Sequence, residues 1–565
     1  MKKLVVTSLL IAGIFSLNSC ARQGTPSGGP KDQTPPKLLG SNPDTLAVNV
    51  DPNIKEIEID FDEYIQLKDY SKNVVISPPF ERNPVVTPIT SADKKIKIKL
   101  QEPLLPNSTY SFNFGEAIQD YNEGNKLSNF TYVISTGNFI DSLSVKGRVF
   151  PGYDFELPKK VLVGLYQADE NFNDSVILKN KPYYVSRVNE SGEYDLKYLK
   201  QGRYKLVAFE DKVENTKIDN GREKVAYHSD FIDLTDKQVV NLKLFKTKPA
   251  YRVSKSEQKG YGHAVIRTEG TTGPVTITPI EREFKTLKID AHPAKDSINI
   301  WFDPKAENFA SKSERLRFSV EHEGKTETAT ILYLAPTTEY VPGYKSMNES
   351  VLSPTRPFKI VGSAPLKKID KSLIHVFKDT VQIPFEAEID SINQQEVKFN
   401  FKKELGDNFE INIYPKALID HFDQANDTIA YQIKMGKRED FGNLKVRLQG
   451  LSEELPVILQ LVKNSPKYEV IEELKGYNRL FNLDYLAPGE YFLRLVLDEN
   501  KNGVWDTGNL MENKQPEPVY IYPNKITVRA MWDADETWII GKDSEFVSPI
   551  PVKKPEETTN NTTNK

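Results

Sequence analysis

Alternation of apolar and polar residues is the feature that most constrains the fold of this chain. Between residues 37 and 139, the runs 57–61, 96–100, 110–114 and 130–134 each place apolar side chains at every second position. A period of two puts one face of a strand on a core and the other face in water. Several such strands, separated by Pro- and Asn-containing turns, predict an antiparallel β-sandwich.

Four pieces of this region carry a family resemblance. They are Pro35-Pro36 at the entry, the strand at 57–61 followed by Asp62-Glu63, the stretch 104–110 and the turn 120–125. In these pieces the region resembles the bacterial Ig-like domains first described in surface-layer proteins. The resemblance implies an Ig-like β-sandwich at 37–139 and implies no particular activity.

An internal repeat extends the all-β prediction to the rest of the chain. Residues 194–221 match 481–508 after a shift of 287 positions without a gap. Both segments resemble the small prealbumin-like β-sandwiches that act as spacers in bacterial surface proteins. Residues 409–414 also echo 110–115, more faintly. The residues that follow this echo are Ala117 and Asp120 in the first copy and Ala417 and Asp420 in the second.

We therefore predict an all-β, elongated multi-domain chain of tandem Ig-like and prealbumin-like β-sandwiches. A length of 565 residues has room for several domains. The expected order is a signal peptide at 1–19, a flexible tether at 20–36, an Ig-like domain at 37–139, a prealbumin-like β-sandwich at 140–247, a divergent β-sandwich at 248–352, a second Ig-like domain at 353–438, a second prealbumin-like β-sandwich at 439–540 and a disordered tail at 541–565.

The N-terminus has the form of an export signal. Lys2 and Lys3 precede the apolar run 4–15, which is too short to span a bilayer. The ending Leu17-Asn18-Ser19-Cys20 resembles the lipobox of bacterial lipoproteins, whose signal is removed before the cysteine. The resemblance implies a covalent lipid on Cys20, the only cysteine of the chain, and stable attachment through several acyl chains. A stray cysteine in an ordinary signal peptide is the alternative interpretation.

Over nearly its full mature length the chain resembles the Ig-like-domain lipoproteins of Bacteroidota outer membranes. The resemblance implies an exported protein that is anchored to the outer membrane by its lipid. Ala21 and Arg22 follow Cys20 without an acidic cluster. Surface-exported lipoproteins of this phylum often carry acidic residues at that place. The cell surface and the periplasmic face therefore both stay open.

Composition and motifs exclude several classes of protein. A net charge of −4 over the whole chain offers no basic face for nucleic acid. The sequence has no Gly-x-Ser-x-Gly elbow and no spare cysteine nucleophile. Its six histidines form no closely spaced pair, so a zinc site is unsupported. They are His228, His263, His292, His322, His375 and His421. We therefore predict a protein that is not an enzyme.

One short motif indicates a metal. Oxygen side chains stand at positions 1, 3, 5 and 9 of the segment 498–506, and Gly503 stands at position 6. This pattern is the front half of a calcium loop of EF-hand type. The expected Ca²⁺ ligands are Asp498, Asn500, Asn502, the carbonyl of Val504, and Asp506. Position 12 is Asn509 rather than glutamate, and Glu512 is the candidate substitute.

The alternative interpretation of the same segment is an Asx-rich turn that is held by side-chain to backbone bonds. The corresponding segment of the other repeat keeps Asp211, Asn215 and Asp219. There, however, Val213 replaces the ligand at position 3 and Thr216 replaces the glycine. We predict that the first copy binds no metal and that the second binds calcium weakly.

These observations favour a non-catalytic, lipid-anchored scaffold or protein-interaction subunit of an outer-membrane complex. Its expected partners are the membrane, through the anchor, and other outer-membrane proteins. One alternative is a glycan-binding surface lipoprotein, and another is an enzyme with two carboxylates facing across a cleft. Aromatic residues that could stack on sugars are Tyr64, Tyr70, Tyr183, Tyr184, Trp532 and Trp538. For the apolar segment 528–540 we predict closure of the last core.

Overall fold

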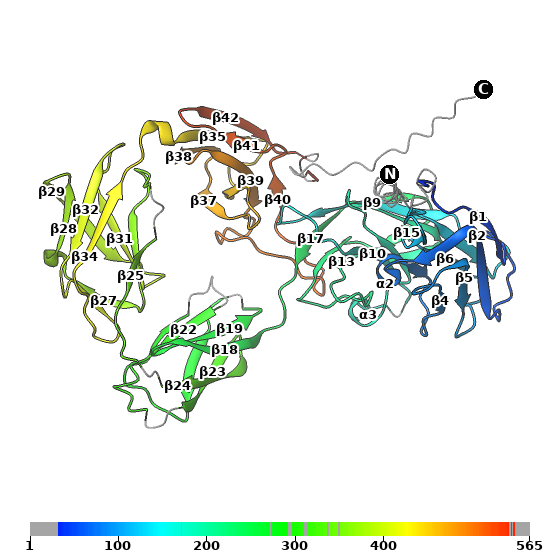
Figure 1. The fold of residues 1–565 in the computed structure, drawn as a ribbon, viewed down its shortest axis with the longest axis horizontal. Helices are drawn as coiled ribbons and strands as arrows, with labels where there is room; N and C mark the ends of the chain where they lie inside the picture. The colour runs from blue at the N-terminus through cyan, green and yellow to red at the C-terminus, as the bar shows by residue number, and fades with distance from the viewer. Residues whose placement is uncertain are drawn as a thin grey trace, which may run out of the picture. The chain divides into compact units, whose positions relative to one another are not determined.

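The structure is a computed structural model that describes residues 32–547, apart from positions 171, 272, 292–296, 310–312, 336–337, 348–350, 542–543 and 545. The expected signal peptide 1–19 and Cys20 lie outside the described residues. The chain divides into two compact units, residues 1–141 and 142–565. Strands make up nearly all regular structure (Figure 1), which confirms the prediction of tandem β-sandwiches. Among the described residues, no helix has the length and apolarity needed to cross a membrane.

The first unit contains an antiparallel β-sandwich. Its elements are β1 (Leu38–Asn42), β2 (Glu56–Leu67), α2 (Tyr70–Asn73), β3 (Val75–Ser77), β4 (Val85–Thr87), β5 (Asp93–Lys99), β6 (Thr109–Asn113), β7 (Ile118–Asp120) and β8 (Thr131–Ser135). One sheet has the order β1-β2-β5-β4 with β7 also on β2, and the other has the order β3-β6-β8. Ile57 and Ile59 of β2 lie in the core, whereas Glu58 between them pairs with Lys95 and Lys97 of β5. The alternation therefore points apolar side chains inward, as predicted.

A buried aspartate forms the late turn of this sandwich. The Asp120 carboxylate accepts hydrogen bonds from the backbone N–H groups of Glu123, Gly124 and Asn125. Burial alone raises the pKa of Asp120, but these hydrogen bonds outweigh it and leave the pKa below its usual value. The turn that carried part of the family resemblance is therefore held by a charged side chain.

The second unit begins with strands β9 to β17, here called the first repeat. Its elements are β9 (Leu143–Pro151), β10 (Val161–Gln167), α3 (Ser175–Lys179), β11 (Tyr184–Arg187), β12 (Glu193–Leu199), β13 (Gly202–Glu210), β14 (Lys224–Tyr227), β15 (Ile232–Leu234), β16 (Gln238–Val239) and β17 (Leu242–Lys246). The sheet order is β11-β10-β13-β14-β17-β9-β12, with β15 on β13 and β16 on β9. Because β17 pairs with both β14 and β9, the sheet is continuous.

The next sandwich, here called the middle sandwich, lies between the two repeats in sequence. Its strands are β18 (Arg252–Gly260), β19 (His263–Glu269), β20 (Thr276–Ile280), β21 (Lys288–Asp290), β22 (Ser297–Trp301), β23 (Ser313–His322) and β24 (Lys325–Leu334). The two sheets have the orders β18-β19-β22-β21 and β20-β23-β24. Both contribute side chains to one core, which includes Ile298, Phe318 and Ile331.

A further sandwich follows, in the region predicted as a second Ig-like domain. Its elements are β25 (Tyr344–Ser346), β26 (Phe358–Gly362), β27 (Leu366–Ile369), η1 (Lys371–Leu373), β28 (Ile374–Lys378), β29 (Val381–Ile383), β30 (Phe385–Ile389), β31 (Glu396–Phe401), β32 (Asn408–Ile413), β33 (Leu418–Asp420) and β34 (Ile429–Lys434). The sheets have the orders β25-β26-β31-β30, β29-β28-β32-β34 and β27-β33. Buried Asp420 accepts the backbone N–H groups of Phe422 and Gln424. The sequence echo between Asp120 and Asp420 thus reflects the same kind of turn.

The last sandwich, strands β35 to β42, is here called the second repeat. Its elements are η2 (Arg438–Asp440), β35 (Gly442–Gln449), β36 (Val457–Lys463), β37 (Val470–Gly476), β38 (Leu480–Leu486), β39 (Gly489–Leu497), β40 (Val519–Ile521), β41 (Ile526–Val528) and β42 (Asp533–Ile539). The sheets are β38-β35-β42 and β37-β36-β39-β40, with β41 on β39. The hydroxyl groups of Tyr204 and Tyr491 donate to the carbonyls of Lys200 and Ala487, each four residues upstream. The sequence repeat is therefore a repeat of strands and of this bond.

Candidate functional site

The loop after β39 is the predicted calcium site. Asp498 is buried, and its two carboxylate oxygens accept the backbone N–H groups of Asn502 at 3.0 Å and Gly503 at 2.8 Å. The Asn500 side-chain oxygen accepts the N–H of Asn502, and the Asn502 oxygen accepts the N–H of Val504. Gly503 has a φ of 78°, a conformation that glycine adopts without strain. The side-chain oxygens therefore serve as hydrogen-bond acceptors within the loop.

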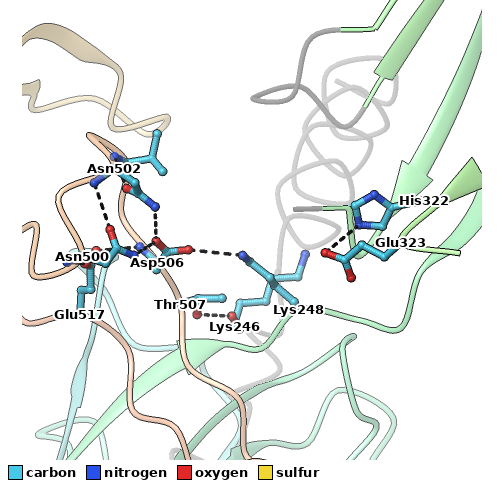
Figure 2. A network of polar contacts seen from close by, with 10 residues as sticks. Lys246, Lys248, His322, Glu323, Asn500, Asn502, Asp506, Thr507 and Glu517 are labelled. Carbon is cyan, nitrogen blue, oxygen red and sulfur yellow. Dashed lines mark hydrogen bonds and ion pairs between the residues drawn. The ribbon is translucent and has the colours of Figure 1, made fainter. Parts of the chain in front are cut away.

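Asp506 closes the same loop. The side-chain amides of Asn500 and Asn502 both donate to its Oδ2, at 2.5 and 2.6 Å, and Lys248 Nζ lies 3.5 Å from its Oδ1 (Figure 2). Burial raises the pKa of Asp506, but these amide bonds and the nearby lysine outweigh it, so the pKa lies below its usual value. Four predicted side-chain ligands, Asp498 among them, are thus brought together and joined to one another.

Glu517 belongs to this site but lies outside the predicted motif. One of its carboxylate oxygens accepts the backbone N–H of Asn500 and the other accepts that of Asp506, at 3.3 and 2.9 Å. Burial raises the pKa of Glu517. Glu512, the candidate substitute at position 12, is exposed instead. The glutamate that bonds to this loop therefore lies outside the spacing of the motif, and Glu512 as a calcium ligand stays a prediction.

The first repeat builds the same loop from partly different residues. Asp211 is buried, and its two oxygens accept the backbone N–H groups of Asn215 at 3.0 Å and Thr216 at 3.3 Å. The Asn215 amide donates to Asp219 at 3.3 Å. Glu223 accepts the backbone N–H of Asp219, as Glu517 does for Asp506 in the second repeat. Burial raises the pKa of both Asp211 and Glu223.

Two positions distinguish the loops. Exposed Val213 stands where the second repeat has Asn500, and Thr216, with a φ of 59°, stands where it has Gly503. The first loop closes without an oxygen ligand at position 3, so the Asx-rich turn describes it fully. Among the residues that the structure describes, no three His, Cys, Asp or Glu side chains form a metal-holding group. Calcium also accepts amide and carbonyl oxygens, and calcium binding by the second loop stays a prediction.

The segment that follows the second loop covers a face of the first repeat. Leu510 is buried against Leu162 and Tyr166 of β10 and Val207 of β13, and Trp505 packs at the edge of the same cluster. Together with Ile177 and Ile218 of the first repeat, this contact buries β10 and β13 at nearly every position rather than at every second one. Each strand therefore has the main core of its own repeat on one face and, on the other, a mixed cluster in which Leu510 and Trp505 of the second repeat join Ile177 of α3.

The first repeat covers the second in return. Phe155, in the loop between β9 and β10, is buried and stacks on Phe492 and Tyr468, with ring centroids 5.0 and 5.2 Å apart. Tyr153 of the same loop stacks on Trp505 at 4.3 Å. We call these reciprocal contacts the repeat interface. Each repeat supplies a loop that packs on the outer sheet face of the other.

Two buried cations lie in the repeat interface. Arg494 is 5% exposed, and its guanidinium lies 3.6 Å from the ring centroid of Tyr153 and donates to the Tyr153 carbonyl at 2.7 Å. Lys205 is 4% exposed, and its ammonium donates to the Ser229 carbonyl at 2.8 Å and to Asn513 at 3.1 Å. Burial lowers the pKa of both cations. Each cation has a bonding partner in the other repeat, so each depends on the interface being closed.

Further bonds close the rim of the interface. The Thr507 hydroxyl donates to the Lys246 carbonyl at 2.6 Å (Figure 2), and the Gln515 amide donates to the Tyr227 carbonyl at 3.0 Å. Phe546 belongs to the segment predicted as a disordered tail, yet its ring packs against Phe150 of β9, with centroids 5.3 Å apart. The contact surface between the repeats therefore extends beyond the last strand.

The other predicted candidates do not gather into one site. Trp538 is buried in the core of the second repeat, in agreement with the prediction that its segment closes this core. Trp532, by contrast, is 61% exposed, and Tyr64 is exposed as well. Tyr183 and Tyr184 pack against each other at 4.9 Å, and Tyr184 is buried.

The described histidines have ordinary packing roles. The ring of His263 stacks on Trp301 at 3.6 Å, and His421 donates from Nε2 to the Thr286 carbonyl at 2.8 Å. His322 lies 3.9 Å from Glu323 (Figure 2). His292 lies outside the described residues.

Comparison with known proteins gives one family match. Residues 32–136 match the model of a bacterial Ig-like domain. No curated protein matches the chain. Among solved structures, the surface-layer protein SbsC is 10% identical with a TM-score of 0.14, over 91% of this chain and 68% of that chain. An I-band fragment of titin is 12% identical with a TM-score of 0.12, over 45% and 95%.

A DUF3823 family protein from Parabacteroides merdae is 15% identical with a TM-score of 0.12, over 34% of this chain and 98% of that chain. Identities and TM-scores of this size support no statement about function. The family match covers only the first sandwich. Residues 32–136 are thus similar to bacterial Ig-like domains, as the sequence resemblance predicted.

Proposed function

We propose that this chain is a non-catalytic, lipid-anchored protein of the bacterial cell envelope, acting as a scaffold or protein-interaction subunit of an outer-membrane complex. The repeat interface is the observation that carries the proposal. Tyr153, Phe155 and Leu510 pack on the outer sheet faces of the two repeats and join the repeats to each other. A chain that joins its own duplicated domains in this way is suited to holding other proteins in place.

Attachment to the membrane is the second part of the proposal. Its support is the lipobox resemblance at Cys20, and its partner is the outer membrane. Metabolic labelling with a fatty acid, followed by membrane fractionation, tests it. We expect label on the wild-type chain, and we expect Cys20→Ala to move the chain to the soluble fraction. An unlabelled wild-type chain in the soluble fraction would overturn this part.

Partner binding has its own test. The chain is extracted in mild detergent, captured by an affinity tag, and the co-purifying proteins are identified by mass spectrometry. We expect a fixed set of envelope proteins, with Phe155→Ala losing members of the set and the exposed control Phe139→Ala keeping them. A wild-type chain that runs alone at every detergent strength contradicts the proposal. Protease shaving of intact cells then distinguishes the cell surface from the periplasmic face.

Glycan binding at the surface is the second candidate function, and the exposure of Trp532 favours it. The ring lies in the turn between β41 and β42, with the Arg529 guanidinium 5.2 Å from its centroid. An exposed aromatic ring offers a stacking surface to sugars. Affinity electrophoresis in polysaccharide gels tests this function. Retardation that Trp532→Ala abolishes supports it, and unretarded migration in every gel excludes it.

A further inference from the structure

The middle sandwich and the sandwich of strands β25 to β34 meet in a small aromatic cluster, here called the joint. Its buried members are Trp301 of β22, Ala364 and Phe422, and Tyr261 and Tyr340 pack against them. The Phe422 ring lies edge-on to the rings of Tyr261 and Tyr340, with centroids 5.2 and 4.9 Å apart. The two sandwiches are therefore connected by side-chain packing as well as by the chain that links them.

His421, next to Phe422, forms a direct bond across the joint. Its ring Nε2 donates to the carbonyl of Thr286 in the middle sandwich, at 2.8 Å, and its backbone N–H donates to the Pro365 carbonyl at 2.7 Å. Thr286 is itself fixed, because its N–H and its hydroxyl both donate to buried Glu307 at 2.6 Å. Both ends of the bond across the joint are thus held in place.

The surroundings of the His421 ring disfavour a positive charge. Burial is the main reason why the pKa of His421 lies below its usual value of 6.5, and Lys288 of β21 and Lys367 of β27 lower it further. Asp420 and the bond to the Thr286 carbonyl act in the opposite direction and are outweighed. The Asp420 carboxylate already accepts the Tyr340 hydroxyl and two backbone N–H groups.

We propose that His421 makes the joint a pH-sensitive hinge, closed while the imidazole is neutral and opened when it takes up a proton. Protonation keeps the Nε2–H that donates to Thr286, so the bond itself is not the cause. The cause is a charge held away from water between Lys288 and Lys367, and opening the joint returns that charge to water.

The sign of the effect follows from the lowered pKa. The closed joint keeps its full stability above 6.5 and loses it as the pH falls from there toward the lower value of the closed state. Because one proton is taken up, the ratio of open to closed chains should rise by at most about tenfold for each pH unit. This inference stands independently of the lipid anchor and of the proposed scaffold role.

His263 is a second histidine near the joint and has to be separated from His421. Its ring stacks on Trp301 at 3.6 Å, and its Nε2 lies 2.9 Å from the side-chain oxygen of Asn299. Both partners belong to the middle sandwich. Burial lowers the pKa of His263 as well, and Lys259 adds to this effect. A response to pH can therefore be assigned to His421 only with variants of each histidine.

Pulsed electron paramagnetic resonance between two spin labels measures the hinge in the full chain. Thr328→Cys in β24 and Gln432→Cys in β34 place the labels at exposed positions of the two sandwiches, and Cys20→Ala leaves them as the only thiols. We expect one narrow distance distribution at about pH 8 and a second, broader component at about pH 5, on either side of the range in which histidine titrates.

Three variants in this labelled chain identify the responsible group. His421→Gln keeps a donor for the Thr286 carbonyl without a titrating group and should stay narrow at both pH values. His421→Lys is charged at both and should show the broad component at both. His263→Gln should behave as the parent chain.

Hydrogen exchange in β22 and β31 distinguishes opening of the joint from unfolding of a sandwich. We expect both core strands to stay protected at about pH 5 while the broad component grows. A parent chain with the same narrow distribution at both pH values overturns the proposal. So does a response that persists in His421→Gln or is lost in His263→Gln, a closed joint in His421→Lys, or a broad component that appears only when β22 or β31 loses protection.

Discussion

The two repeats share strands and a loop, but they differ at the positions through which they meet. The shift of 287 residues places Lys205 on Phe492 and Val207 on Arg494. Each repeat thus carries one buried cation on the outward face of its central strand, at positions two residues apart. Each cation is bonded by the other repeat. Two copies of one fold have therefore become complementary rather than interchangeable.

This difference shows how a duplicated domain acquires a single partner. A pair made of two first repeats would bury Lys205 on both sides without Asn513 to accept its hydrogen bond. A pair made of two second repeats would likewise bury Arg494 without Tyr153. An uncompensated buried charge is strongly unfavourable, so these cations oppose pairing of like with like. The cations therefore contribute to the specificity of the interface as well as to its stability.

Removing a covering ring should have the largest effect on this pairing. Phe155→Ala leaves a cavity against Phe492 and Tyr468 and should lower the free energy of unfolding of the repeats by about 4 kcal/mol. Hydrogen exchange of peptides from β36 and β39 measures the loss locally, which avoids a two-state assumption for a multi-domain chain. The control Phe139→Ala alters an exposed ring and should change stability by less than about 0.5 kcal/mol. Equal exchange in both variants would mean that the repeats do not depend on this contact.

Exchanging the cation for the residue of the other repeat tests complementarity directly. Arg494→Val gives the second repeat the side chain that the first has at Val207. We expect a loss of about 3 kcal/mol, because the contact with Tyr153 and the 2.6 Å hydrogen bond that Arg494 donates to the Gln460 side chain disappear from a buried place. Arg447→Ala, at an exposed ion pair with Asp535, is the matched control and should cost less than about 1 kcal/mol. If Arg494→Val is as stable as the wild type, the repeats are interchangeable after all.

Much of the architecture could be predicted from the sequence, because periodicity and repetition are local signals. The alternation around Ile57 predicted a strand with one buried face, and the unbroken apolar run at 161–166 is typical of a strand buried on both faces. The run does not say what covers the second face. The covering residues, Phe155 and Leu510, lie in irregular loops with no period, and each is distant in sequence from the strand it covers. The repeat interface could therefore not be predicted.

The candidate site was predictable to the same degree. The motif spacing correctly predicted that Asp498 and Asp506 lie close together, since these residues belong to one tight turn. Glu517 was not predicted, because the loop that precedes it has no fixed length. The motif also does not reveal that Asp498 accepts two backbone N–H groups, which makes it a structural residue whether or not calcium binds. Trp532 lies just before strand β42 and is exposed, whereas Trp538 lies within the strand and is buried. Composition does not show where a strand begins.

Calcium should stabilise the second loop and not the first, and the expected difference in free energy of unfolding is moderate. Asn500→Val gives the second loop the residue found at Val213 and removes one oxygen ligand while Asp498 keeps its bonds. A site with a millimolar dissociation constant should stabilise the wild type by about 1.5 kcal/mol at about 10 mM calcium, and the variant by much less. Melting curves with calcium and with chelator measure this difference. Asp498→Ala should be destabilised in both conditions, because its two backbone N–H donors lose their acceptors.

The control for calcium is the first loop. Val213→Asn supplies the missing oxygen and should gain little, because Thr216 still replaces the glycine at position 6. Wild-type melting curves that coincide with and without calcium would remove the metal from the second loop. The turn interpretation would then describe both loops.

The smallest expected difference is the response of the two loops to pH. The pKa of Asp506 is lowered in the folded chain, so its contribution is present above the unfolded value of 3.8 and is lost as pH falls through the folded value. Asp506→Asn should therefore be less stable than the wild type at pH 7, by about 0.5 kcal/mol for a partly exposed ion pair. This deficit should shrink as the pH falls below 3.8.

Asp211 in the first loop should respond in the opposite direction. Burial raises its pKa, so its contribution is present below 3.8 and is lost as pH rises through the raised folded value. Relative to the wild type, Asp211→Asn should thus gain stability as pH rises, whereas Asp506→Asn should lose it. Local hydrogen exchange of each loop, corrected for intrinsic rates at each pH, measures both differences. Slopes of the same sign would show that the two loops share one electrostatic environment, despite Lys248 lying beside only the second.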